Sequence, residues 1–167
     1  HGHRLKSMYF LNNLKKSFVI IGLFSIHAWA LAGSYEDFFK AIQLDRPQEV
    51  QQILQRGFDP NTVNPTGVPA LLVALQEQSF LAADVLAQHP QTQVDARSAR
   101  DESALMLAAL RGQERLVVHL VSRGAAVNKV GWTPLHYAAT GGHVRVAAFL
   151  IGAQADVNAE SANGTTP

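Results

Sequence analysis

The side chains best suited to chemistry in this 167-residue chain are its seven histidines. A zinc protease would carry two of them as HExxH, and this pattern does not occur. His1 and His3 could chelate a metal loosely, but no further ligand lies near them in the sequence. The chain has no cysteine, which excludes disulfides, thiolate metal sites and a cysteine nucleophile. We therefore expect neither a metal nor a cofactor.

The serines and acidic residues fit structural roles better than catalytic ones. There is no GxSxG elbow, and Ser103 suits the cap of a helix. Asp101 and Glu102 stand beside a predicted helix start, where the helix dipole favours carboxylates. The glycines form neither GxGxxG nor GxxxxGK[ST], so no phosphate-binding loop is indicated. Because no nucleophile–base pair appears, we predict that the protein is not an enzyme, and a small hydrolase is the least favoured alternative.

The charges of the chain are scattered. It has 14 Lys and Arg against 13 Asp and Glu, for a formal net charge of +1. With 47% hydrophobic residues it should fold. The basic excess lies in the first 32 residues, and the part from Gly33 onward is mildly acidic. Because no basic stripe could follow a phosphate backbone, we expect no nucleic-acid partner.

Residues 1–32 have the order of a secretory signal. Lys15 and Lys16 precede an uncharged run over residues 18–32 (FVIIGLFSIHAWALA), which ends in small residues suited to cleavage. The run has 15 residues, whereas a membrane-spanning helix needs about 20, so a cleaved signal is favoured over an uncleaved anchor. Met8 is the expected start of this signal. We therefore expect an exported protein without membrane insertion after cleavage, periplasmic in the first instance and secreted as the alternative.

The rest of the chain repeats itself. Residues 131–158 (GWTPLHYAATGGHVRVAAFLIGAQADVN) match residues 101–128 (DESALMLAALRGQERLVVHLVSRGAAVN) position by position without a gap. Weaker copies precede both. The leading positions of successive copies are 33, 34, 30 and 33 residues apart, and the short step arises in the third connection. The predicted copies cover residues 34–66, 67–100, 101–130 and 131–163, and residues 164–167 open a further copy, as expected of a fragment of a longer array.

These copies resemble the ankyrin repeat family from residue 33 to residue 167. Residues 133–139 (TPLHYAA) match the family's helix-opening motif, and residues 155–159 (ADVNA) match its closing motif. The resemblance implies an all-α solenoid of stacked helix-turn-helix units with short hairpin-like connections. It further implies structural hydrogen bonds for the two histidines of the fourth copy. The structural motif residues are Thr133, Pro134, Leu135, His136, Gly142 and His143.

The physical chemistry of the motif agrees with this resemblance. Thr133 can cap a helix, and Pro134 then occupies a position where a missing N–H costs nothing. Gly142 can adopt the left-handed conformation that ends the first helix. Two departures stand out in earlier copies: Pro69 replaces the capping residue, and Gln78 replaces the turn glycine.

Binding is the function left by this elimination. The resemblance implies a concave groove formed by the connections and by the exposed side of each first helix. An exposed tryptophan, Trp132, among arginines has the composition of an interface anchor. Packing of Trp132 over the shortened third connection is the open alternative. The predicted partner-binding residues are Trp132, Arg97, Arg100, Glu102, Leu110, Arg111 and Lys129.

The sequence therefore predicts a non-enzymatic protein-interaction module outside the cytoplasm. It would act as a scaffold, an escort or an inhibitor of a partner protein, and the arginines favour an acidic partner. A secreted effector that binds a target in another cell is the alternative.

Overall fold

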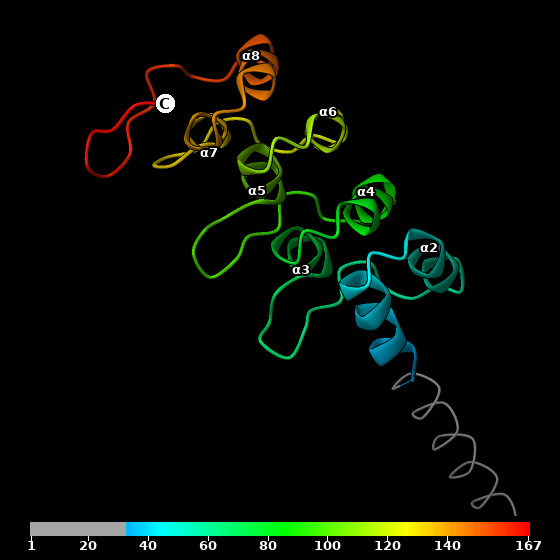
Figure 1. Cartoon of the computed structure of the whole chain (residues 1–167). Coiled ribbons are helices and arrows are strands. Elements are labelled where there is room, and N and C mark those ends of the chain that lie inside the picture. The colour runs from blue at the N-terminus through cyan, green and yellow to red at the C-terminus, as the bar shows by residue number, and fades with distance from the viewer. Residues whose placement is uncertain (1–32) are drawn as a thin grey trace, which may run out of the picture. The chain divides into compact units, whose positions relative to one another are not determined.

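The computed structural model describes residues 33–167, so the predicted signal lies outside the described residues. In this part of the chain the regular structure is helical, which confirms the all-α prediction (Figure 1). A helix over residues 33–43 comes first. The helices that follow are α2 (Pro47–Gln55), α3 (Ala70–Gln76), α4 (Phe80–Gln88), α5 (Ala104–Leu110), α6 (Glu114–Ser122), α7 (Pro134–Gly141) and α8 (Val144–Gly152).

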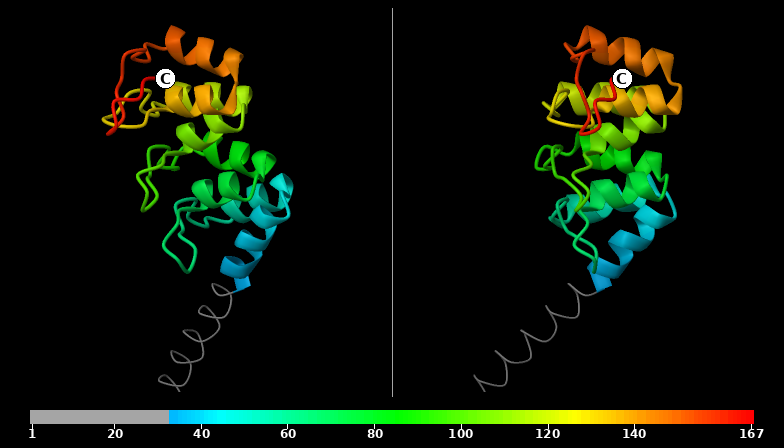
Figure 2. Two further views of the ribbon diagram at one scale, coloured as in Figure 1. Left: turned by 60° about the vertical axis from the view of Figure 1, so that its left-hand side comes forward. Right: turned by 90° about the vertical axis from the view of Figure 1, so that its left-hand side faces the viewer.

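Consecutive helices pair, and the pairs stack. Helix α3 contacts α4 within its pair and α5 in the next pair, while α4 contacts α6. Helices α3, α5 and α7 thus form one row, and α2, α4, α6 and α8 form a second row beside it, to the right in Figure 1. The long connections project from the side of the first row (Figure 2). The first row and the connections line one face of the stack. The partner-binding groove was predicted on this face.

The core lies between the two rows. Every residue of α5 from Ala104 to Ala109 is buried, so this helix is enclosed on nearly all sides. The small side chains of Ala74, Ala108 and Ala138 are fully buried and allow the close approach of neighbouring helices. In the second row Leu86, Leu120 and Leu150 are fully buried at equivalent positions. Burial of each such leucine contributes about 1.5–3 kcal/mol to folding.

The helix starts follow the capping rules where the sequence allows it. The Thr133 side chain accepts a hydrogen bond from the His136 N–H and caps α7. The Ser103 hydroxyl accepts from the Met106 N–H at 3.2 Å and caps α5. Helix α3 begins after Pro69 without a side-chain cap.

The turn inside each helix pair requires a left-handed residue. It is Asp45 (φ 49°), Gln78 (φ 59°), Gly112 (φ 65°) and Gly142 (φ 70°) in the successive copies. Asp45 compensates for the strain of this conformation, because its carboxylate accepts a hydrogen bond from the Ala82 N–H at 2.8 Å and so caps α4.

One arginine secures the irregular end of the second copy, where the His89–Gln93 stretch carries an extra residue. Arg123, at the end of α6, donates from Nη1 to the carbonyls of Ala87 (2.6 Å) and His89 (2.7 Å). Its Nη2 donates to the Pro90 carbonyl at 3.1 Å. The third copy thereby satisfies backbone acceptors that the end of α4 leaves open.

The fourth copy packs against the third through His143. Its Nε2 donates to the Leu110 carbonyl at 2.9 Å, and its ring lies over two glycines. A Cβ atom added at Gly112 would come within 2.4 Å of the ring, and one added at Gly141 would come within 2.5 Å of the Leu110 carbonyl oxygen. Glycine is therefore required at both positions by packing, and at Gly112, where φ is 65°, by backbone conformation as well.

Because of this packing, we predict that replacing the helical glycine Gly141 by alanine destabilises the protein. Alanine normally stabilises a helix relative to glycine by about 0.5–1 kcal/mol. We expect Gly141→Ala to lower the free energy of unfolding by about 1–3 kcal/mol instead, because its methyl group would overlap the Leu110 carbonyl oxygen. Urea denaturation followed by circular dichroism measures the change. Gly152→Ala in α8 is the matched control and should be neutral or stabilising, since no atom lies within 4 Å of its added Cβ. Equal effects of the two changes would contradict the close packing.

Candidate functional site

Trp132 lies immediately before the first turn of α7 and is 40% exposed. Its ring centroid is 5.2 Å from that of His136 and 5.8 Å from that of Tyr137, with the tryptophan and tyrosine rings at 89° to each other. The side chain therefore packs on the helix-opening motif along one side and remains accessible along another. The two roles considered for Trp132 are compatible in this geometry.

A hollow of about 380 Å³ opens beside Trp132. Tyr137 and Thr140 of α7 line it together with Leu110 of α5 and Glu102, which precedes α5. The structure thus brings together three of the predicted partner-binding residues: Glu102, Leu110 and Trp132. Tyr137 was not predicted as a site residue, although it could have been. On a helix that begins at Pro134, Tyr137 and Thr140 are three residues apart and therefore share a face, and both line the hollow.

Glu102 is the carboxylate of this hollow, with a side chain only 15% exposed. Its Oε1 accepts a hydrogen bond from the Tyr137 hydroxyl at 3.3 Å, and its Oε2 accepts from the Ser98 hydroxyl at 3.3 Å. Burial, with the Glu102 charge as the next cause, raises the pKa of Tyr137 above its ordinary value. The phenol therefore stays protonated at neutral pH and can donate.

The predicted arginines differ in their surroundings. Arg100 is 83% exposed on its side chain, and its Nε lies 3.9 Å from Glu102 Oε2. Arg97 directs Nη1 toward the sulfur of Met106 at 3.9 Å. Arg111 follows Leu110 as the C-cap of α5 and is exposed. Within residues 33–167 neither Arg97 nor Arg111 has a carboxylate at ion-pair distance.

Lys129 has a different environment, since its side chain is only 15% exposed. Its ammonium lies 2.6 Å from Asp101 Oδ2 and donates to the carbonyls of Val130 (2.9 Å) and Trp132 (3.3 Å). The hydrogen bond from Lys129 lowers the pKa of Asp101 below its ordinary value. Like Glu102, Lys129 is thus a predicted partner-binding residue whose charged group is already engaged by the protein itself.

The fourth copy shows why the Trp132 carbonyl accepts its hydrogen bond from a lysine. His136 accepts from the Thr133 N–H at Nδ1 (3.1 Å), so its Nε2 carries the proton and donates to the Thr165 carbonyl at 2.9 Å. The equivalent residue of the third copy is Met106, whose thioether cannot donate. The carbonyl equivalent to that of Thr165 belongs to Trp132, and Lys129 supplies its donor instead.

We expect Lys129→Met to lower the midpoint of thermal unfolding by a few degrees, because two carbonyls lose a charged donor. The pKa of Asp101 is lowered in the folded state, so this pair stabilises the protein at neutral pH, and its contribution is lost as the pH falls and Asp101 takes up a proton. The difference in midpoint between wild type and variant should therefore narrow in acid. Lys40→Met, at an exposed lysine, is the control and should change little. An unchanged midpoint for Lys129→Met would show that the short connection does not need its lysine.

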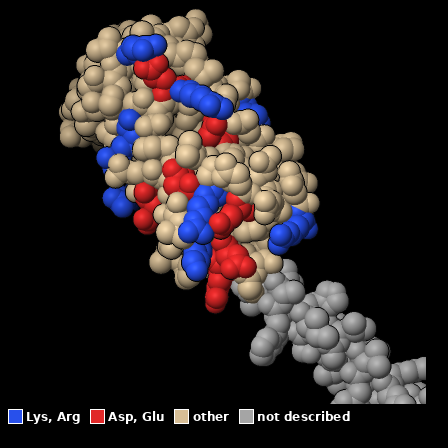
Figure 3. Space-filling model, turned by 45° about the vertical axis from the view of Figure 1, so that its right-hand side comes forward, with Lys and Arg blue, Asp and Glu red and all other residues tan. Residues whose placement is uncertain are grey.

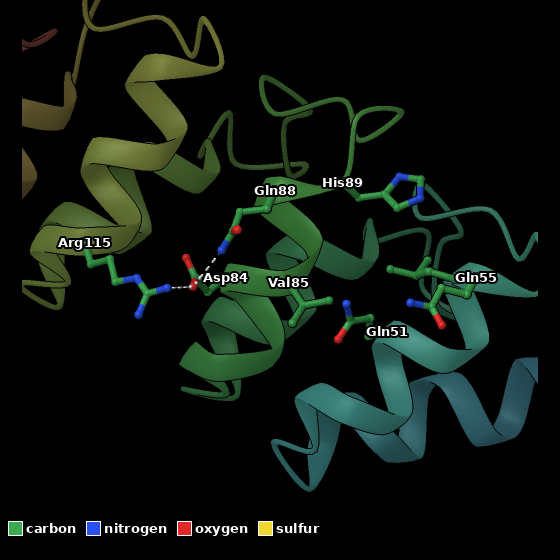
Figure 4. Close-up of a pocket in the computed structure, with 8 residues that line it drawn as sticks. Gln51, Gln55, Asp84, Val85, Gln88, His89 and Arg115 are labelled. Atoms are coloured by element: carbon green, nitrogen blue, oxygen red, sulfur yellow. Dashed lines mark hydrogen bonds and ion pairs between the residues drawn. The ribbon is translucent and has the colours of Figure 1, made fainter.

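A second hollow, of about 420 Å³, lies on the opposite side, between α2, α4 and α6 (Figure 4). Asp84 borders it, with Oδ1 2.6 Å from His119 Nδ1 and Oδ2 3.2 Å from Arg115 Nη2. Gln88 Nε2 also donates to Asp84, at 2.9 Å (Figure 4). Sequence reasoning missed this network because its residues belong to different copies. Its carboxylate is already satisfied, and the arrangement holds α4 against α6.

The surface on the side of the second row carries intermingled charges (Figure 3). The ion pair Arg145–Glu114 (3.2 Å), for example, links α8 to α6, its neighbour in the second row. Among residues 33–167 no group of three potential metal ligands comes together. The same part of the chain contains no helix that is both long and apolar enough to span a bilayer.

The described residues form a stack of helix pairs, which is the architecture of a repeat protein. The family model of ankyrin repeats (3 copies) matches residues 38–129 and 83–161, so the chain belongs to the ankyrin repeat family. This confirms the predicted family.

Curated relatives share this region of the chain. It is similar to the 2-5A-dependent ribonuclease of Mus musculus, with 37% identity over 71 residues that cover 40% of this chain and 10% of that protein. It is also similar to the ankyrin repeat and SAM domain-containing protein 6 of Rattus norvegicus (32% identity, 64% of this chain, 12% of that protein). A third relative is the neurogenic locus notch homolog protein 1 of Xenopus tropicalis (28% identity, 76% of this chain, 5% of that protein).

The chain thus spans 12% or less of the length of these relatives. The similarity to the ribonuclease is partial and corresponds to its ankyrin region. Ankyrin repeats are generally non-enzymatic and indicate a module for protein–protein interaction.

Proposed function

We propose that this protein binds another protein through the groove between the connections and the first row of helices, with Trp132 as the central anchor. The observation that supports the proposal is the hollow beside this tryptophan, at positions where the repeat register predicts contact residues. A large aromatic side chain that is 40% exposed can still bury much of its surface against a partner. Arg97, Arg100 and Arg111, which the repeat register predicts to lie near Trp132, favour an acidic surface on the bound protein.

The anchor is tested with a matched pair of variants. Proteins captured by the full chain are identified by mass spectrometry, and the Kd of each is then measured for purified variants. We expect Trp132→Ala to weaken binding by about 2 kcal/mol or more, roughly 30-fold, as at an interface hot spot. Val118→Ala is the control, because Val118 is similarly exposed (42%) but lies on α6, in the second row. Arg97→Glu should weaken binding of an acidic partner without disturbing the core.

Thermal unfolding of the same variants separates binding from stability. Because Trp132 is only partly buried, its removal should cost less than the about 3–5 kcal/mol lost with a core aromatic. Lost binding by a folded Trp132→Ala protein supports the groove. Normal binding by Trp132→Ala together with loss by Val118→Ala would place the partner on the second row of helices and reject the proposal.

We further propose that the protein is exported and acts outside the cytoplasm, as a scaffold, escort or inhibitor of its partner. The support is the order of basic, apolar and small residues before Gly33. A secreted effector is the alternative function, and the location of the captured partner, in the same cell or in another, discriminates between them.

Export is tested with a fusion of residues 8–40 to a reporter that is active only outside the cytoplasm. We expect reporter activity and a product shortened near residues 30–32, where the small residues lie. An inactive, uncut fusion would reject export. An active but uncut fusion would replace the cleaved signal by a membrane anchor.

A further inference from the structure

Two aromatic rings and one carboxylate line the hollow beside Trp132. The faces of aromatic rings carry negative potential, and two such rings, those of Trp132 and Tyr137, meet here at 89° with centroids 5.8 Å apart. Glu102 adds a carboxylate to the same hollow. Rings and carboxylate together attract a cation, and Leu110 can pack on the alkyl part of a long side chain.

We propose that this hollow receives the side chain of a lysine or arginine from the bound protein. The inference rests on the proposed function and specifies the chemistry of the partner at the anchor. The cationic group would lie against the two rings and pair with Glu102. Tyr137 holds that carboxylate through the hydrogen bond to Oε1. Oε2 accepts from the Ser98 hydroxyl at 3.3 Å, and a carboxylate oxygen has a second lone pair that can accept from the incoming cation.

The protein's own cations do not prevent a partner's lysine or arginine from pairing with Glu102. Arg100 approaches Glu102 Oε2 only to 3.9 Å and is 83% exposed, and such surface pairs contribute little to stability. An incoming cation can therefore displace it. Lys129 cannot compete, because Asp101 and two backbone carbonyls already hold its ammonium.

Other occupants fit the hollow less well. An acidic side chain would face the Glu102 carboxylate and the negative faces of the rings. An apolar side chain would remove Glu102 from water without giving it a new partner, which is costly. Arg97, Arg100 and Arg111, which the repeat register predicts to lie near Trp132, are then available to acidic residues on either side of the inserted one. The partner segment would carry one basic residue within an otherwise acidic stretch.

The test uses Trp132 fluorescence in the full chain with Trp29→Phe, because the chain has only these two tryptophans. The probes are the N-acetyl methylamides of lysine, arginine, norleucine and glutamate. We expect saturable binding of the lysine and arginine probes, at least about fivefold tighter than that of norleucine, which has the lysine chain without its charge. Glu102→Gln should weaken binding of the cationic probes about fivefold or more. Arg100→Ala should strengthen it, since a competing cation is removed.

Two results would overturn this inference. Equal binding of norleucine and lysine would show an apolar hollow. Tighter binding of glutamate, lost in Arg100→Ala, would show an anion site. Failure of the proposed function is recognised separately, by a protein partner whose affinity is unaffected by Trp132→Ala. Circular dichroism of Glu102→Gln and Arg100→Ala establishes that any change in probe binding occurs in a folded protein.

Discussion

The structure depends on burial that no single helix pair can achieve. Helix α5 has seven residues, too few to persist alone in water, yet its residues from Ala104 to Ala109 are all buried. Its partners are α6 in its own pair and α3 and α7 in neighbouring pairs. Stability is therefore shared between copies, and the small residues Ala108 and Ala138 set how closely they approach. The proposed groove lies where this stacking leaves the ends of the first helices and their connections open to solvent.

Because the same buried positions recur in each copy, the sequence could predict the helix pairs and the family. The spacing of Leu135 and Ala138, and the glycine at position 142, sufficed for the helix pairs and the family, because these features are local and recur. The interactions of Lys129 and Asp84 were not predictable in the same way. Asp84 is held by residues of the next copy, more than 30 positions away. Lys129 takes over a hydrogen bond that the family motif gives to a histidine, so the repeat pattern itself hides its role.

The structure shows fewer unpaired cations near Trp132 than the sequence predicted. Lys129 lies against Asp101, and Arg100 lies near Glu102, so two of the four predicted cations face carboxylates that stand just before α5. Arg97 and Arg111 have no such carboxylate partner within residues 33–167. Beside Trp132 the potential is set by rings and by Glu102 instead. A count of charges along the chain could not show this separation, because Glu102 and Tyr137 meet only after α5 and α7 pack together.

The short third connection accounts for both the position of Lys129 and the exposure of Trp132. In the first, second and last connections a polar side chain closes the turn: Asn64 accepts from the Val68 N–H (2.9 Å), Ser98 from the Glu102 N–H (3.2 Å) and Ser161 from the Thr165 N–H (3.1 Å). The third connection is too short for this turn, and Lys129 binds its carbonyls instead. Less chain is then present beside α7, and Val130 is 96% exposed. Lys129 thus gives the short connection a fixed conformation in which Trp132 can be both anchored on His136 and accessible to a partner.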